Sequence, residues 1–252
     1  MNKVVSLNTA RLSCHNCHLA RLCIPRSLEK GQLDKLASCM QQSYTLNKGE
    51  KLFVAGRPLK SFFAIRTGSI KTFITTSDGD ERVIGLHMPG ELLGFDALAH
   101  NRYGTTAVAI ESSIVCEIPH KNLHELCIRE PRIAEHFMIL MSSVIADEHK
   151  VMAMLGHKKA ESRIATLLLN VSSQLHACGY SASEFNLAMS RGDLGSYLRL
   201  ALETISRILT HLQDEEIIRV NRKNITILDI ERLREIADAS DTDITYIKKI
   251  VD

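Results

Sequence analysis

Three cysteines lie close together near the start of the chain, in the stretch SCHNCHLARLCIP. Cys14, Cys17 and Cys23 are separated by two and five residues, and His15 and His18 lie between them. Thiolate and imidazole groups at this spacing can bind zinc, and thiolates can hold an iron–sulfur cluster. A disulfide or the absence of any chemical role is also open on spacing alone.

The rest of the composition narrows these choices. The chain has seven cysteines among 252 residues, so complete pairing within the chain is impossible. Its apolar runs are far shorter than the ~20 residues that cross a bilayer, and MNKVVSLNTARL lacks a secretory core. We therefore expect a cytoplasmic protein without membrane contact, in which thiols stay reduced. A net charge of +2 does not by itself indicate a nucleic-acid partner.

Residues 44–120 have the pattern of many short strands. Apolar runs such as SFFAI, IKTFITT, RVIGLH and SIVCEI alternate with the turn signals NKGE, AGRP, RTGS, SDGD and MPGE. This alternation predicts a β-barrel or β-roll, with a hairpin turn at Asp78-Gly79. A short helix over 28–40 is expected to connect the cysteine segment to the roll, because its leucines follow helical spacing.

A long helix is predicted over 130–155, where two apolar stripes lie side by side. One stripe can pack on the roll and the other on a second copy of the chain; the alternative is a helix buried only within its own chain. Glu148 interrupts the second stripe. The predicted dimer interface consists of Phe137, Leu140, Met141, Val144, Ile145, Glu148, Val151 and Met152.

The segment MSRGDLGSYLRLALETISRILTHLQDEEII predicts a helix-turn-helix. Ser190 can cap a first helix that ends near Leu198, and a second helix begins near Leu202 after a short break. Ile205, Ile208, Leu209 and Leu212 form the expected buried side of the second helix. A preceding helix over 158–177 and a closing hairpin with its turn at 221–224 complete a winged helix-turn-helix domain.

The exposed face of the second helix has side chains that suit DNA. Arg207 can donate two hydrogen bonds to guanine, Glu203 can accept from cytosine, and Ser206 can bond either base. An ordinary solvated helix face is the alternative. The predicted DNA contacts are Arg191, Arg199, Glu203, Thr204, Ser206 and Arg207. Because the domain is not strongly basic, binding to double-stranded DNA is expected to need two copies.

A β-roll, a long helix and a helix-turn-helix in this order resemble bacterial transcription regulators of the CRP/FNR family. GELLGFDAL (90–98), SRGDLGSYLRLALETISR (190–207) and the cysteines carry the resemblance. The oxygen-responsive FNR branch joins an N-terminal C-x2-C-x5-C set to a distant cysteine in V-C-E-I-P. Cys14, Cys17, Cys23 and Cys116 match this set, which implies a four-iron, four-sulfur cluster; zinc is the alternative. Cys39, Cys127 and Cys178 match no ligand position.

Cyclic nucleotide control is not expected. In the cyclic AMP branch, an Arg-Ser or Arg-Ala pair after the G-E-x-x-G turn holds the phosphate. Thr105-Thr106 stand at this place, and Arg102 is displaced by several residues. The phosphate would therefore have no positioned cation.

The resemblance implies an oxygen-sensing global transcription regulator of anaerobic metabolism, and not an enzyme. An intact cluster is expected to favour a homodimer that reads a palindrome with TTGA-type half-sites, and air to switch binding off. Two copies of Glu148 that face each other across the dimer would repel and oppose pairing; the alternative is that Glu148 points outward. The loop TSDGDER, with Gly79 and Asp80, resembles the loop with which family activators contact RNA polymerase; the alternative is an ordinary polar hairpin tip. A same-fold regulator with a zinc or thiol switch and an iron–sulfur electron carrier are the competing functions.

The expected fold class is α+β, divided into five segments. They are a cysteine-rich segment (1–27), a cyclic-nucleotide-binding-like β-roll (28–127), a dimerisation helix (128–156), a winged helix-turn-helix domain (157–237) and a tail (238–252) without an assigned role. Two departures from the family pattern concern the turn between the helices. Arg199 stands where many members have glycine, and Ala201 cannot supply a capping side chain.

Overall fold

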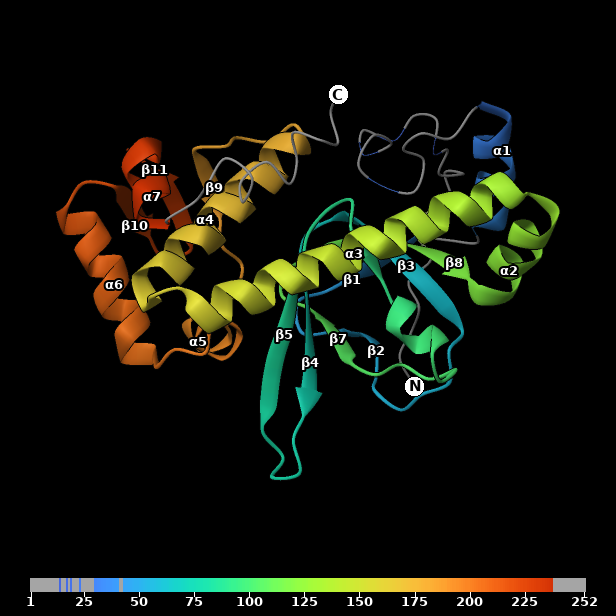
Figure 1. Ribbon diagram of the computed structural model, residues 1–252, viewed down its shortest axis with the longest axis horizontal. Coiled ribbons are helices and arrows are strands. Elements are labelled where there is room, and N and C mark those ends of the chain that lie inside the picture. Colours follow the sequence, from blue (N-terminus) through green and yellow to red (C-terminus); the bar gives the residue numbers. More distant parts are fainter. Residues whose placement is uncertain are drawn as a thin grey trace.

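The computed structural model describes Cys14, Cys17, Leu19, Cys23 and residues 30–40 and 43–237 (Figure 1). The remaining residues of the predicted cysteine segment and the tail over 238–252 lie outside the described residues. In the described part of the chain, no helix is long and apolar enough to cross a membrane.

The N-terminal unit is the expected β-roll. Two four-stranded antiparallel sheets have the strand orders β1-β8-β3-β6 and β2-β7-β4-β5. Its elements are α1 (Lys30–Cys39), β1 (Ser43–Leu46), β2 (Lys51–Phe53), β3 (Ser61–Thr67), β4 (Ile70–Thr75), β5 (Glu81–His87), β6 (Leu92–Leu93), the 3-10 helix η2 (Phe95–Leu98), β7 (Thr106–Ala109) and β8 (Ser113–Pro119). Phe53, Phe63, Ile65, Ile70 and Val115 belong to the apolar core of the roll.

Two turns of the roll need glycine. Gly79 has a φ of 87° at the tip of the β4–β5 hairpin, which confirms the predicted turn. Gly68 has a φ of 79° between β3 and β4, where an added Cβ would lie 2.3 Å from Ser113 Oγ. Only glycine therefore fits the second turn without a shift of β8.

The roll is followed by two helices rather than one. The sequence did not predict α2 (His120–Arg129), which precedes α3 (Pro131–His157). The expected boundary at 127–128 falls inside α2, and the actual break is at Glu130, where φ is −129° and ψ is 83°. Pro131 explains the break, because proline suits the first turn of a helix but disfavours helical angles in the residue before it.

The C-terminal unit is a small helical domain with a three-stranded sheet in the order β10-β11-β9. Its elements are α4 (Ala160–Ala177), β9 (Glu184–Asn186), α5 (Arg191–Leu198), α6 (Leu202–Asp214), β10 (Ile218–Asn221), β11 (Asn224–Ile227) and α7 (Ile230–Ala237). The pairing of Asn221 with Asn224 confirms the predicted hairpin.

The two units share apolar contacts. Val83 and Met88 of the roll belong to the same core cluster as Met154 of α3 and Leu168 and Leu194 of the C-terminal unit. Figure 1 shows α3 crossing the molecule from the side of α1 and α2 to the C-terminal unit, while the β4–β5 hairpin projects beside α5. The helix-turn-helix is thus packed on the roll through α3 and β5.

Candidate metal centre and nucleic-acid interface

The structure brings the four predicted cysteine ligands to one place. Cys116 lies in β8 between Ser43 of β1 and Ala64 of β3. Cys116 and Ile118 are two residues apart and share one face of β8. Ile118 packs in a core cluster with Leu36, so α1 covers this face. A cavity of about 30 Å³ is lined by Cys14, Cys17, Leu19, Cys23, Leu36, Met40, Ala64, Ile65, Arg66 and Cys116.

Two of the thiols in this cavity, those of Cys14 and Cys116, are disfavoured as isolated anions. Burial raises the pKa of Cys116 to about 11, and the nearby Cys14 and Cys17 raise it further against the positive charge of Arg66. Burial and Cys17 also raise the pKa of Cys14, whose Sγ donates to Met40 Sδ at 3.2 Å. Converting both of these thiols to thiolates therefore requires a positive centre beside them.

The donor set matches a four-iron, four-sulfur cluster, which takes four thiolates. The apolar side chains Leu19, Leu36 and Met40 restrict water, and Arg66 supplies a cation to the lining. Among the described residues, no three cysteine, histidine, aspartate or glutamate side chains are arranged to hold a metal ion. A cavity of about 30 Å³ has room for one or two waters. Cluster binding therefore requires the cysteines to separate.

The predicted helix-turn-helix is present, and its first helix has the expected cap. The Oγ of Ser190 accepts from the amide of Asp193 at 3.0 Å, and Asp193 Oδ2 accepts from the amide of Ser190 at 3.3 Å. Arg199 has left-handed angles, with φ 55° and ψ 51°, which confirms the special backbone expected there. Ala201 makes no side-chain cap, as the sequence indicated.

Gly195 is a structural residue of this motif that the sequence reasoning missed. A Cβ at Gly195 would lie 2.7 Å from the carbonyl oxygen of Leu200 and 3.7 Å from Ile205 Cδ1. The amide of Leu200 donates to the Gly195 carbonyl at 2.9 Å. A glycine inside a helical pattern was the available signal, because it often marks a close approach.

The recognition helix α6 presents the predicted polar face. Ile205, Ile208, Leu209 and Leu212 are buried. Glu203, Ser206 and Arg207 are exposed on the other side, and Thr204 is half-buried. In the first helix and the turn, Arg191 is half-buried and Arg199 is exposed. This face is thus free for contact with a groove of DNA.

The predicted dimer face is only partly available. Phe137 and Leu140 are 5% and 8% exposed and pack with Leu36 and Ile118 in the chain's own core. Their assignment to the interface is corrected, because α1 and α2 cover that side of α3. Met141 and Val151 are half-buried, and Glu148 is exposed. The large apolar side chains of α3 that are exposed are Met138, Ile139, Val144, Ile145 and Met152.

Two further predicted positions lie in the roll. Gly79 and Asp80 are exposed at the tip of the β4–β5 hairpin.

Thr106, at the place where the cyclic AMP branch holds the phosphate, and the displaced Arg102 make other contacts. The Oγ1 of Thr106 accepts from the amide of Ala55 at 3.1 Å, and Arg102 donates to the Gly56 carbonyl at 2.7 Å. Both groups are therefore engaged with the backbone of the roll.

Comparison with known proteins gives the same division of the chain. A cyclic nucleotide-binding domain model matches residues 44–130, and a Crp-like helix-turn-helix domain model matches residues 162–236. The chain is 41% identical to the fumarate and nitrate reduction regulatory protein of Vibrio cholerae, over 91% of this chain and 92% of that protein. It is 43% identical to the transcriptional activator protein anr of Pseudomonas aeruginosa, over 86% and 88%. The solved structure of FixK2 from Bradyrhizobium japonicum aligns with a TM-score of 0.72 and 26% identity, over 79% of this chain and 98% of FixK2.

Proposed function

Because the chain belongs to the CRP/FNR family of transcription regulators, we propose that it is an oxygen-responsive regulator of anaerobic metabolism. Its DNA binding would depend on a four-iron, four-sulfur cluster held by Cys14, Cys17, Cys23 and Cys116. The main support for this proposal is that the four cysteines line one cavity, although about ninety residues separate Cys23 from Cys116 in the sequence. The names of its relatives, which include an anaerobic regulatory protein of Haemophilus influenzae, support the same role.

The proposed role of each residue at the cavity follows from the side chains that line it. When bound, the cluster supplies an oxygen-sensitive redox centre. The four cysteines bind it as thiolates, and the guanidinium of Arg66 offsets part of their negative charge. Leu19, Leu36 and Met40 limit access of water to the sulfurs.

Occupation of the cavity would affect α3 through the contacts of α1. Leu36 of α1 lines the cavity and packs in the same core cluster as Phe137 and Leu140 of α3. Lys35 of α1 also forms an ion pair with Glu130, directly before α3. Separating the cysteines around a cluster therefore moves a helix that is packed on the N-terminal half of α3.

Pairing of two chains through α3 is the next step of the proposal. Val144, Ile145 and Met152 are 45%, 56% and 59% exposed, and a second copy of the same face would cover them. Two facing copies of Glu148 would repel each other, so the paired state needs the support of the loaded cavity. In the dimer, the two α6 helices would read half-sites of a TTGA-type palindrome about 34 Å apart. The exposed hairpin tip at Gly79 and Asp80 would contact RNA polymerase.

Zinc is the second candidate occupant, with a thiol or zinc switch in place of oxygen sensing through iron. The small cavity favours it, because a single ion bound by cysteines needs less separation of the sulfurs than a cluster.

The test is purification without oxygen, followed by iron, sulfide and zinc analysis and an absorption spectrum. We expect about four irons and four sulfides per chain, and binding to a TTGA-type duplex that is lost in air. Cys116→Ser should lose both the iron and the binding. Cys127→Ser is the matched control, because Cys127 lies in α2 and does not line the cavity. A colourless, zinc-loaded protein that binds DNA equally in air would refute the proposal and establish the zinc alternative.

A further inference from the structure

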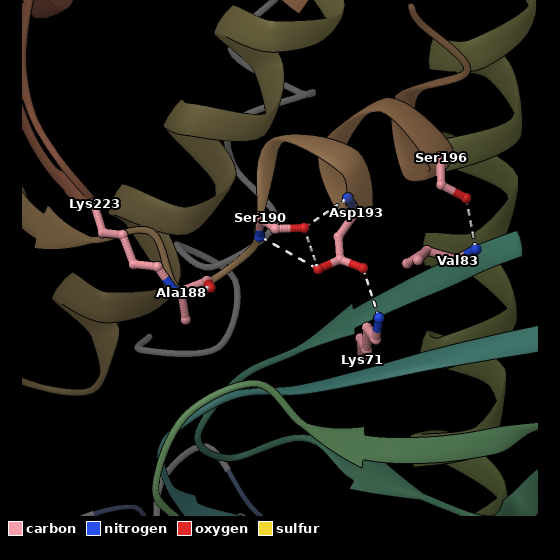
Figure 2. A network of polar contacts seen from close by, with 7 residues as sticks. All are labelled: Lys71, Val83, Ala188, Ser190, Asp193, Ser196 and Lys223. Carbon is pink, nitrogen blue, oxygen red and sulfur yellow. Dashed lines mark hydrogen bonds and ion pairs between the residues drawn. The ribbon is translucent and has the colours of Figure 1, made fainter. Parts of the chain in front are cut away.

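The first helix of the helix-turn-helix is held on the roll by two polar contacts (Figure 2). Lys71 of β4 forms an ion pair with Asp193 of α5, with Nζ 2.6 Å from Oδ1. The amide of Val83 in β5 donates to Ser196 Oγ at 2.9 Å. We refer to Lys71, Val83, Asp193 and Ser196 as the interdomain clamp.

The Ser196 contact covers a sheet edge. β5 is the edge strand in the order β2-β7-β4-β5, so its outward amides have no strand partner. Ser196 accepts from one of these amides at Val83, and the Val83 side chain is only 6% exposed in a core cluster shared with Leu194 and Leu198. Helix α5 thus replaces a neighbouring strand at this position, which fixes it laterally on the roll.

The ion pair fixes the point at which α5 begins. The side chains of Lys71 and Asp193 are 16% and 19% exposed, so solvent screens their attraction only in part. One carboxylate oxygen of Asp193 accepts from Lys71, and the other accepts from the Ser190 amide and hydroxyl in the helix cap. Burial alone would raise the pKa of Asp193. Hydrogen bonds from Lys71 and Ser190 outweigh it and lower the pKa, so the pair stays charged at neutral pH.

The docked arrangement leaves the reading face free. Glu203, Ser206 and Arg207 are exposed on α6 while the interdomain clamp is closed. Gly195 of α5 and Leu200 of the turn are hydrogen-bonded, so an α5 fixed on the roll also fixes α6. The clamp therefore orients the recognition helix without covering it.

We propose that Lys71 is a positioning residue for DNA binding, which acts through Asp193 to present the two recognition helices of a dimer at one spacing. This inference rests on the proposed binding of a palindrome by a dimer. Fixing α5 before DNA binds removes the cost of ordering two loosely attached domains. The clamp should consequently matter for a palindrome and not for a single half-site.

The test compares Lys71→Met with Lys51→Met in the cluster-loaded, full-length protein. Lys51 is an exposed lysine of the same sheet, in β2, and controls for the lost charge. The probes are a TTGA-type palindrome, the same palindrome with one base pair inserted between its half-sites, and a single half-site. Lys71→Met should weaken binding to the correct palindrome by about tenfold and reduce discrimination between the two spacings. Half-site binding, dimer fraction and iron content should equal those of Lys51→Met.

Two further measurements keep the outcomes distinct. The double variant Lys71→Met/Asp193→Asn should bind the palindrome no more weakly than Lys71→Met alone, because each of the two substitutions removes the same Lys71–Asp193 ion pair. Hydrogen exchange in β5 and α5 should speed up in Lys71→Met, which reads the docking even without DNA. Equal spacing discrimination in both lysine variants, an equal loss on the half-site, or unchanged exchange would overturn the inference. Failure of the wild-type protein to bind the palindrome would instead overturn the proposed function. The hydrogen exchange result would still show whether Lys71 holds α5 on the roll.

Discussion

Substitution of Gly195 by alanine tests whether the turn between α5 and α6 depends on a close backbone approach. The added Cβ would lie 2.7 Å from the Leu200 carbonyl oxygen, closer than real Cβ atoms come to such an atom. This oxygen belongs to the backbone of the turn and cannot rotate away as a side chain would. Gly195→Ala must therefore push the turn, and with it the start of α6, away from α5.

Gly192 provides a matched control in the same helix. A Cβ there would meet only Ser190 Oγ, at an ordinary 3.8 Å. Both substitutions gain up to about 1 kcal/mol from the better helix propensity of alanine. Only Gly195→Ala adds the cost of overpacking, which is about 1–3 kcal/mol. The difference between the two variants should therefore equal the overpacking cost alone.

Thermal unfolding of the two variants without metal gives the comparison. For a chain of this size, 1 kcal/mol corresponds to roughly 2–4 °C in the midpoint. We expect Gly192→Ala at or above the wild-type midpoint and Gly195→Ala several degrees below Gly192→Ala, with weaker DNA binding. If Gly195→Ala unfolds at the same temperature as Gly192→Ala or higher, the close approach does not constrain the turn and the reasoning is wrong.

Three other outcomes follow from single side chains. Arg199→Gly relieves the left-handed strain at φ 55° and should raise the free energy of unfolding by up to about 1 kcal/mol. DNA affinity should fall, and its dependence on salt should decrease by about one ion in a salt titration. Burial raises the pKa of Asp147 to about 7; Lys150 opposes this, and Glu91 and Glu148 add to it. Because the pKa of this carboxyl is raised on folding, the protein loses stability as pH rises from 3.8 to 7. Asp147→Asn should therefore stabilise the protein by about 1–2 kcal/mol at pH 8 and by little at pH 4, measured by urea unfolding; the range is reduced because the Asp147 side chain is 30% exposed. Glu148→Ala should raise the dimer fraction of the metal-free protein in analytical ultracentrifugation, and no rise would exclude charge repulsion across α3.

The helix-turn-helix was predictable because its signals are local. Ser190 stands directly before a helical pattern, and the break at Arg199 and Ala201 separates two such patterns. The Ser190 side chain bonds backbone within one helical turn, and the backbone break lies directly between the two helices, so sequence order is enough to identify the motif. The β-roll was predictable for a related reason, since its turns are marked by glycines such as Gly79 whose φ is positive.

The orientation of α3 was not predictable in the same way. Two adjacent apolar stripes indicate that the helix has two faces suited to burial, but not which neighbour covers which stripe. Phe137 and Leu140 face inward because α1 and α2 pack there, and α2 itself carried no signal that was recognised. Met138 and Ile139 were missed for the same reason, as they are exposed only because the opposite side of the helix is covered.

The cysteine cavity and the helix-turn-helix are connected in two ways, by helix α3 and by the interdomain clamp. Helix α3 has 27 residues, which corresponds to a length of about 40 Å. Phe137 near its start packs in the core cluster of Leu36, beside the cysteine cavity, and Met154 near its end packs in the cluster of Val83, beside α5. A shift of α1 alone would move α3 without fixing the recognition helix, because α4 and the turn before it lie between them. The interdomain clamp removes this freedom, since Lys71 ties α5 directly to the roll that also carries Cys116. The cysteine cavity and the recognition helix are thus both attached to the same β-roll, which is the condition for a change at one to alter the geometry of the other.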